Sequence, residues 1–281
     1  MATWLITGCS SGLGKNIAEA VLAQGDSAMI TARDVSSLAD LAARYPDAAY
    51  ARAMDVTCDE QVASAVSAAE DRFGSIDVLV NNAGYGYRAA VEEGEDAAVG
   101  RLFDTLFFGP VRTIKAVLPG MRARRAGTIV NVSSIGARLS PAGSGYYAGA
   151  KAALEAMTLS LRREVAPLGI RAVTIEPGGL RTDFGGRSLT QVATPISDYA
   201  ETAGLRRIEN DRVHGSQIGD PTKAAAAIIE VVESSAPPFL FVLGSDAVAG
   251  FDETAQQLRS DVRKWKNLSC STDFDSSHSP K

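Results

Sequence analysis

Seven short β-rich runs alternate with longer helical stretches along most of this 281-residue chain. The runs are Thr3–Ile6, Ser27–Ala32, Ala48–Met54, Ile76–Val80, Thr128–Val132, Arg171–Ile175 and Phe239–Val242. Between them, apolar residues recur at helical spacing, as in Gly12–Gln24, Glu60–Phe73, Ala97–Met121 and Tyr147–Ala166. Regular alternation implies parallel strands joined by right-handed crossovers. We therefore expect an α/β fold, a doubly wound parallel sheet of about seven strands with helices on both faces.

The chain shows no internal repeat and no Pro-, Gly- or Ser-rich linker, so a single domain over residues 1–245 is expected. Residues 178–221 break the alternation with a long, polar, glycine-bearing stretch, which we interpret as a mobile cover over the substrate. Residues 246–281 complete the chain: helical spacing runs over Ala247–Leu268, and Ser269–Lys281 is predicted to be a loose polar tail.

Composition excludes several classes of protein. The net charge is −5, and the basic cluster Arg122, Arg124 and Arg125 is short enough to be a solvated helix end, so no nucleic-acid partner is expected. No apolar run approaches about 18 residues, the length of a membrane span. The first residues lack a basic start and a cleavage signature, which predicts a cytoplasmic protein.

Metal and disulfide chemistry are also not indicated. Cys9, Cys58 and Cys270 lie far apart and form no Cys-x-x-Cys motif. His214 and His278 both lie in polar stretches, so neither a histidine-based triad nor a metal centre is expected.

A glycine-rich loop follows the first predicted strand and leads into the first predicted helix. Glycines let a backbone turn tightly and approach a pyrophosphate, while a helix start offers free N–H groups and positive potential. An ordinary tight turn is the alternative. We predict a dinucleotide site of the Rossmann type, formed by Gly8, Ser10, Ser11, Gly12, Leu13 and Gly14.

Arg33 ends the second predicted strand, where the adenosine ribose of a dinucleotide would lie. An acidic side chain there suits the free 2′-hydroxyl of NAD, whereas an arginine suits a 2′-phosphate. Asp34 follows at once but can serve as a cap for the next helix. The sequence therefore favours NADP over NAD, although Arg33 as a plain surface residue stays open.

Tyr147 and Lys151 lie four residues apart, about 40° around a helix, so both side chains can reach one site. Tyr146 is the rival, but it would lie about 140° from Lys151. An ammonium about 4 Å from a phenol favours the phenolate by roughly 4 kcal/mol and could bring a pKa of about 10 to near 7. Such a pair is suited to proton transfer, although chance also produces it on solvated helices.

Over residues 2–245 the chain resembles the short-chain dehydrogenase/reductase family. The glycine loop matches the family's Thr-Gly-x-x-x-Gly-x-Gly, and further matches follow four later strands: Asp55-Val56, Asn81-Asn82-Ala83-Gly84, Asn131-Val132-Ser133-Ser134 and Pro177-Gly178. Ser133 and Ser134 would face opposite ways on a strand. The family's serine lies thirteen residues before its tyrosine, and this spacing selects Ser134.

The resemblance implies a set of roles. Asp55 and Val56 would flank the adenine, Asn82, Ala83 and Gly84 would line the ribose, and Pro177, Gly178, Leu180 and Thr182 would lie at the nicotinamide. Hydride transfer would interconvert a secondary alcohol and a ketone or aldehyde, with Tyr147 as general acid or base. Ser134 would bind the substrate oxygen, and Lys151 would lower the pKa of Tyr147 and bind the nicotinamide ribose.

One residue departs from the family pattern. Many relatives carry an asparagine that holds a water beside the lysine, where this chain has Leu106. Three accounts therefore stay open. The first is an active NADP-dependent oxidoreductase, the second is a catalytically impaired NADP(H)-binding redox sensor, and the third is a lyase or epimerase that uses the cofactor transiently. The intact Ser134, Tyr147 and Lys151 favour the first account.

Further expectations concern the substrate and assembly. Aromatic residues in predicted loops either shape an apolar site for a small molecule or pack in the core: Tyr85, Tyr87, Phe184 and Tyr199. Trp265, in the last predicted helix, is expected to be a docking anchor rather than a ligand contact. The resemblance also suggests a homodimer or homotetramer packed through Ala97–Met121 and Tyr147–Ala166.

Overall fold

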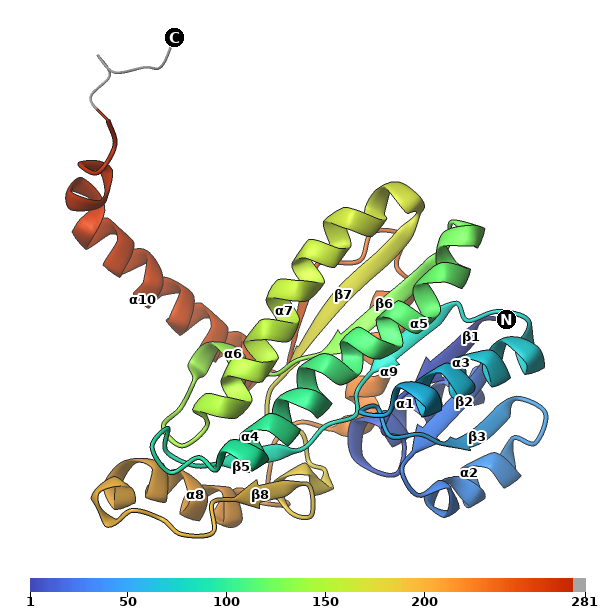
Figure 1. Ribbon diagram of the computed structural model, residues 1–281, viewed down its shortest axis with the longest axis horizontal. Helices are drawn as coiled ribbons and strands as arrows, with labels where there is room; N and C mark the ends of the chain where they lie inside the picture. Colours follow the sequence, from blue (N-terminus) through green and yellow to red (C-terminus); the bar gives the residue numbers. More distant parts are fainter. Residues whose placement is uncertain (275–281) are drawn as a thin grey trace.

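The computed structural model describes residues 1–274. Within them, seven parallel strands form one sheet in the order β3-β2-β1-β4-β6-β7-β9 (Figure 1). The strands are β1 Thr3–Ile6, β2 Ser27–Ala32, β3 Ala49–Ala53, β4 Val78–Asn81, β6 Gly127–Val132, β7 Ile170–Pro177 and β9 Leu240–Leu243. The predicted doubly wound, Rossmann-type sheet is confirmed, and no predicted strand end is more than two residues from the observed one.

Helices cover both faces of the sheet (Figure 1). Helices α1 (Gly12–Ala23) and α9 (Pro221–Glu233) pack together on one face, and α3 (Asp59–Phe73), α5 (Gly109–Arg124) and α7 (Gly145–Val165) lie on the other. The short α2 (Ala39–Arg44) packs beside β3. Side chains alternate across the strands: Trp4 and Ile6 belong to the first core, and Leu5 belongs to the second. Both faces of each central strand are therefore buried.

The predicted helix Ala97–Met121 is interrupted. The structure has α4 (Asp96–Phe103), then a π-helical turn (Asp104–Phe108), and then α5. Leu106 lies in the middle of the π turn and is 1% exposed. Turns of this kind are frequent at functional sites, because the extra residue redirects the side chains around it.

The segment 178–221 folds over the carboxyl ends of the strands, together with the short strand β5 (Gly86–Arg88). Its strand β8 (Leu189–Gln191) pairs in parallel with β5, and helix α8 (Leu205–Val213) follows beside it (Figure 1). The predicted break in the alternation is thus observed, and the segment contributes a second, two-stranded sheet. Its mobility stays a prediction.

Helix α10 (Ser245–Cys270) extends away from the body (Figure 1). Trp265 is 56% exposed, and Leu258 and Val262 are also exposed. Trp265 is thus not packed on the body of the chain in the described residues, and its role as a docking anchor stays a prediction. The predicted tail from Ser269 begins inside the helix, and residues 275–281, including His278, lie outside the described residues.

Membrane spans and metal clusters are both absent from residues 1–274. No helix there is long and apolar enough to cross a membrane. In the same range, no group of three or more His, Cys, Asp and Glu side chains is placed to hold a metal ion. Cys9, Cys58 and Cys270 are free thiols, and burial raises the pKa of Cys9 to about 12, so this thiol is inert.

Candidate active site

The strand order reverses between β1 and β4, and the loops after these two strands are fastened to each other. The Thr7 hydroxyl accepts hydrogen bonds from the backbone N–H groups of Asn82 and Ala83, both at 2.9 Å. The Asn82 amide donates to the carbonyls of Thr7 and Gly8 at 2.9 and 3.1 Å. This switch point is where doubly wound sheets bind ligands. Thr7 was not singled out from the sequence, although it opens the matched glycine motif.

The glycine loop has the conformation that the sequence argument requires. Gly8 and Gly12 have φ values of +73° and +60°, a region that side chains disfavour. A methyl group on Gly14 would collide with the Gly8 carbonyl and the Asn82 amide. A methyl on Gly12 would lie 3.5 Å from the Cβ of Thr182, so the loop after β7 reaches the glycine loop. Gly12 and Thr182, which were predicted to bind different parts of the dinucleotide, therefore lie close together at the carboxyl ends of the strands.

The start of α1 is open to an anion. Ser11 is the residue before the helix, and within residues 1–274 its side chain forms no capping hydrogen bond. The first turn carries no acidic residue. Ser10 is exposed, whereas Leu13 packs in the core and holds the turn against the sheet. The first backbone N–H groups of a helix lack intrahelical partners, so this end is suited to a phosphate.

Arg33 is exposed directly after β2, and Asp34, which follows it, is also exposed. The Asp34 carboxylate accepts hydrogen bonds from the backbone N–H and the hydroxyl of Ser36, at 3.0 and 2.7 Å. These bonds lower the pKa of Asp34. The interpretation of Asp34 as a cap is confirmed, which leaves Arg33 as the side chain available at this strand end.

The loops after β3 and β4 continue the same edge. The Asp55 carboxylate accepts from the backbone N–H and the hydroxyl of Thr57, and Val56 is buried against Gly109. Gly84 is exposed, and a methyl group placed on it would lie 3.9 Å from the Lys151 ammonium nitrogen. Gly84, which belongs to the residues assigned to the ribose, thus lies close to Lys151.

Tyr147 and Lys151 are both buried on α7, and Tyr147 is 7% exposed. The Lys151 ammonium donates to the Val132 carbonyl at 2.7 Å and lies 6.0 Å from the centre of the Tyr147 ring. Tyr146 points elsewhere, with its hydroxyl donating to the Val91 carbonyl at 2.6 Å. The structure therefore brings together the pair chosen from helical spacing.

The two serines after β6 face different surroundings. The Ser133 hydroxyl is buried and donates to Glu155 at 2.5 Å. The Ser134 hydroxyl accepts from the Gly136 N–H at 3.0 Å, and a methyl on Gly136 would lie within 3.5 Å of both Ser134 Oγ and the Tyr147 ring. Ser134 is thus the serine beside Tyr147, as the family spacing predicted.

The expected electrostatics of Tyr147 need a correction. Burial raises the pKa of Tyr147, while the Ser134 hydroxyl and the charge of Arg88 oppose that rise. Lys151 is not among the described groups that set this pKa, and its ammonium donates to the Val132 carbonyl. Burial also lowers the pKa of Lys151 to about 8. The expected lowering of the Tyr147 pKa by Lys151 is thus not found in this structure, in which burial raises that pKa.

Arg88 was not singled out from the sequence. It ends β5, is 6% exposed, and its guanidinium carbon lies 5.7 Å from the centre of the Tyr147 ring. The only sequence signal is an arginine within the otherwise uncharged run Tyr85–Val91. Its pairing with the distant β8 decides its burial.

A buried acidic cluster lies behind Ser133. Arg138 bridges Glu155 and Glu176 at 3.1 and 2.6 Å. Burial raises the pKa of Glu155 to about 8, and Glu176 adds to the rise. Glu155 follows Lys151 by one helical turn and its charge raises the pKa of Lys151. Neither Glu155 nor Glu176 was considered from the sequence.

The loop after β7 is held by α10. Pro177 accepts a hydrogen bond from Ile135, and the Gly178 N–H donates to the Leu243 carbonyl. Asp246 accepts from the Gly179 N–H at 2.7 Å and packs against Gly178. Leu180 packs on the first core. This places the loop of the predicted nicotinamide residues at the end of the strands, near the glycine loop.

The four aromatic candidates divide between site and surface. Phe184 lies against Tyr147, with ring centres 5.9 Å apart, and Tyr85 is partly buried in the same cluster. Tyr87 is a buried member of this cluster, whereas Tyr199 bonds to Glu92 at the surface. Phe184 and Tyr85 are thus the two that can border an apolar substrate.

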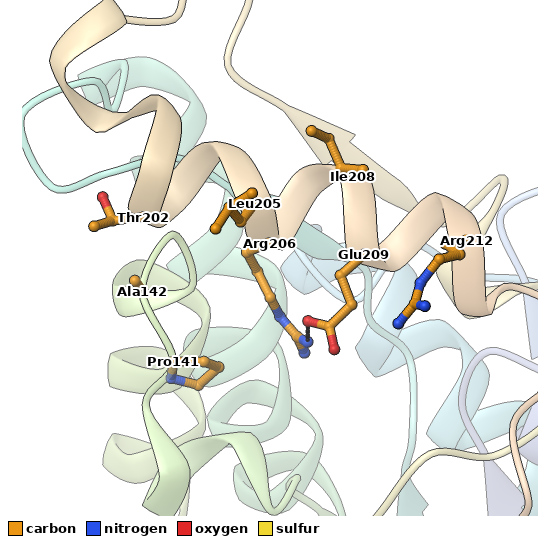
Figure 2. Close-up of a pocket in the computed structure, with 8 residues that line it drawn as sticks. All are labelled: Pro141, Ala142, Thr202, Leu205, Arg206, Ile208, Glu209 and Arg212. Atoms are coloured by element: carbon orange, nitrogen blue, oxygen red, sulfur yellow. Dashed lines mark hydrogen bonds and ion pairs between the residues drawn. The ribbon is translucent and has the colours of Figure 1, made fainter.

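A hollow of about 450 Å³ lies beside this region (Figure 2). It is bordered by α8 and the turn before α7, through Pro141, Ala142, Thr202, Leu205, Arg206, Ile208, Glu209 and Arg212. Arg206 and Glu209 point toward that turn and form an ion pair at 2.7 Å (Figure 2). Ser134, Tyr147 and Lys151 do not border the hollow, so it does not contain these side chains.

Comparison with known proteins gives consistent matches. The family described as short chain dehydrogenase matches residues 2–192. The oxidoreductase BOA17 of Botryotinia fuckeliana (strain B05.10) is 38% identical over 267 residues, which cover 95% of this chain and 97% of that protein.

Solved structures agree with this match. A short-chain dehydrogenase from Streptomyces avermitilis is 40% identical, has a TM-score of 0.91, and the match covers 97% of this chain and all of that one. The 3-ketoacyl-(acyl-carrier-protein) reductase from Brucella melitensis, solved with NADH, is 26% identical, with a TM-score of 0.72 over 86% of this chain and 96% of that one.

Proposed function

This chain belongs to the short-chain dehydrogenase family of oxidoreductases, and on that premise we propose that it is an NADP-dependent enzyme interconverting a secondary alcohol and a ketone or aldehyde. The observation that carries the proposal is the convergence of Ser134, Tyr147 and Lys151 at the carboxyl end of β6. Carbonyl reduction requires an acid, a hydrogen-bond donor for the oxygen and a nearby cation, and Tyr147, Ser134 and Lys151 can supply them in that order.

The residues present fit a dinucleotide. Two glycines with positive φ, a third that excludes even a methyl group, and an uncapped helix start leave room and N–H donors for a pyrophosphate. When bound, the nicotinamide dinucleotide supplies or accepts the hydride. Asp55 and Val56 are assigned to the adenine, Asn82, Ala83 and Gly84 to the ribose, and Leu180 and Thr182, after Pro177 and Gly178, to the nicotinamide.

Chemistry at the substrate oxygen falls to two side chains. Tyr147 is the acid that protonates the oxygen during reduction and the base that removes the proton during oxidation. Ser134 donates a hydrogen bond to the same oxygen as negative charge develops there. Lys151, held by the Val132 carbonyl, supplies a buried cation beside the nicotinamide ribose.

Arg33 supports NADP rather than NAD. It is exposed at the strand end that faces the adenosine ribose in this fold, and Asp34 is bound to Ser36. An arginine forms charge-assisted hydrogen bonds to a phosphate. Replacement of Arg33 by alanine is expected to weaken NADPH binding by about tenfold or more and leave NADH binding unchanged.

The test is titration of the purified protein with NADPH and NADH, followed by a carbonyl panel monitored through the absorbance of the reduced cofactor. The matched control is Arg44→Ala, which removes an arginine that pairs with Glu19. NADPH preference that disappears in Arg33→Ala but persists in Arg44→Ala supports the assignment. Tighter binding of NADH by the unchanged protein refutes it.

A second candidate function is favoured by Leu106. This residue is buried with Tyr147 in one apolar cluster and lies against Gly84, beside Lys151. A leucine holds no water, so the lysine lacks the family's link to solvent. An NADP(H)-binding redox sensor would bind NADPH tightly and oxidise it with no carbonyl in the panel.

Assembly and location are proposed from the family. We expect a homodimer or homotetramer packed through α4–α5 and α7, a cytoplasmic location, and a small-molecule substrate. The catalytic domain spans residues 1–245, with residues 178–221 as its substrate segment and residues 246–281 as an appended helix and tail.

A further inference from the structure

Arg88 has no partner for part of its guanidinium. In the described part of the chain, its Nε and Nη1 atoms are buried and form no hydrogen bond. The whole residue is 6% exposed. A buried polar group without a partner costs free energy, and a buried charge costs more. Such an arrangement at the edge of an active site indicates a ligand that completes it.

The surroundings of Arg88 are positively charged. Burial lowers the pKa of Arg88, and the nearby charge of Arg206 lowers it further. The Nε atom of Arg206 is also buried and, among residues 1–274, without a hydrogen-bond partner. Arg206 in turn borders the hollow beside α8 (Figure 2). Two arginines therefore act on each other at the substrate side of Tyr147.

The nearby carboxylates are occupied by other groups. Glu93 pairs with Arg207 at 3.0 Å and accepts from the Ala90 and Ile196 N–H groups. Glu92 accepts from the Tyr199 hydroxyl, and Glu209 pairs with Arg206 through a different nitrogen. The ion pairs within the described residues leave Arg88 without an acid.

We propose that Arg88 binds a carboxylate of the substrate, so that the enzyme acts on oxo acids and hydroxy acids. The planar fork of an arginine offers paired N–H donors that match the two oxygens of a carboxylate. The guanidinium lies 5.7 Å from the Tyr147 ring centre, so the bound carboxylate lies a few bonds from the carbon that reacts. Tyr85 and Phe184 pack in the same apolar cluster as Tyr147, so the hydrocarbon part of such a substrate would meet apolar side chains.

This inference rests on the proposed function, because only an enzyme has a substrate. Binding of a carboxylate to Arg88 can nevertheless be measured without turnover. The protein saturated with NADP⁺ is titrated calorimetrically with hexanoate and, separately, with the uncharged hexanamide. We expect hexanoate to bind at least tenfold more tightly than hexanamide. The preference should disappear in Arg88→Met and Arg88→Gln.

Arg187→Gln is the matched control, because Arg187 lies just before β8, the strand that pairs with β5, but is exposed and pairs with Asp183 at the surface. This variant should keep the preference for hexanoate. Arg88→Met should fold well, since it replaces an unpaired buried charge by an apolar chain of similar length. Hexanoate should raise the melting temperature of the unchanged protein and leave that of Arg88→Met where it is.

Kinetics then test the substrate class. The 2-, 3- and 4-oxohexanoates are compared with their methyl esters as NADPH oxidants. For the best acid, kcat/KM should exceed that of its ester by at least tenfold, and Arg88→Gln should lower the value for the acid while leaving the ester within about threefold.

The outcomes separate the two proposals. Equal binding of hexanoate and hexanamide, or a preference that survives in Arg88→Met, overturns the carboxylate site. Faster turnover of esters than of acids by the unchanged enzyme also overturns it. Tight, Arg88-dependent binding of hexanoate without oxidation of NADPH by any carbonyl supports the anion site and overturns the reductase proposal instead.

Discussion

The cofactor side and the substrate side of this protein differ in how fully their polar groups are satisfied. On the cofactor side, Thr7 and Asn82 exchange hydrogen bonds between two loops, and Asp34 and Asp55 each bond to the residue two positions ahead. On the substrate side, Arg88 is buried with two nitrogen atoms that have no partner among residues 1–274. The loops of the first side hold each other in place and leave the start of α1 open to an anion, whereas the second side contains a buried charge without a counter-ion among the described residues.

This difference follows from the parts of the fold that form the two sides. A site for a shared cofactor is made mostly of backbone and short side chains next to strand ends, so its geometry follows from the sheet. We expect a site for one substrate to depend on side chains carried by inserted segments, and β5 and residues 178–221 are the segments proposed for that role here. Tyr147 lies at the boundary, with Lys151 toward the cofactor side and Arg88 above its ring.

The largest expected effect comes from Tyr147→Phe, which should affect chemistry alone. Loss of the phenolic oxygen removes the general acid, and turnover should fall by about 10³-fold. NADPH affinity should stay within a few fold, because the ring and its packing are retained. Stopped-flow oxidation of NADPH and direct binding measure the two quantities.

Tyr146→Phe is the control for this change. The Tyr146 hydroxyl donates to the Val91 carbonyl, away from Lys151. Its removal should leave turnover within a few fold. Normal turnover in Tyr147→Phe, or an equal loss in both variants, would contradict the assignment of Tyr147.

Gly14→Ala should damage the cofactor side while sparing the substrate side. The added methyl collides with the Gly8 carbonyl and the Asn82 amide, both of which fix the loop. Overpacking of this kind costs about 1–3 kcal/mol, and NADPH affinity should fall by roughly 10- to 100-fold.

Gly100→Ala is the control, since within the described residues nothing lies within 4 Å of the added methyl on this helical glycine. That variant should be as stable as the unchanged protein or slightly more stable. Equal NADPH affinity in both would show that the loop tolerates a side chain.

The sequence predicted the cofactor side well because its signals are local. Gly8, Gly12, Gly14 and Asn82 follow their strands directly, and the strands are identified by composition. Ser134 and Tyr147 were selected over their neighbours by spacing, and the structure places both beside each other.

The substrate side could not be predicted from the sequence, for physical reasons. Arg88 is buried because β5 pairs with β8, about a hundred residues away, and no local pattern encodes that pairing. The π turn around Leu106 interrupts a stretch whose periodicity is that of one helix. The sequence argument that Lys151 lowers the pKa of Tyr147 omitted burial, which raises the pKa of a phenol and which helical spacing alone does not reveal.

Glu155→Gln tests whether the cluster behind Ser133 holds a neutral acid. Burial raises the pKa of Glu155 from its usual value to about 8. Between about pH 4.5 and 8 the unfolded chain has released this proton and the folded chain retains it, so stability falls as pH rises. The unchanged protein should therefore lose on the order of 2 kcal/mol relative to Glu155→Gln between pH 5 and 7.5.

Chemical denaturation of both proteins across this pH range measures the difference. The other titrating groups are common to the two proteins, so the difference isolates Glu155. Parallel stability curves would mean that Glu155 is ionised throughout and that Arg138 compensates for its burial.

Leu106→Asn, the smallest expected effect, tests the boundary between the two sides. Leu106 lies against Gly84 beside Lys151, so an asparagine there could hold a water next to the ammonium. If proton exchange at Lys151 limits the reaction, turnover should rise by about two- to fivefold. The amide is placed in an apolar cluster, so the variant should also lose about 1–3 kcal/mol of stability.

Leu106→Met keeps the apolar contact and is the control, with turnover unchanged. Rates are expressed per NADPH-binding site, so that partial unfolding does not hide a gain. Unchanged turnover in folded Leu106→Asn would show that Lys151 exchanges its proton by another route, and Glu155, one helical turn away, would then be the next group to examine.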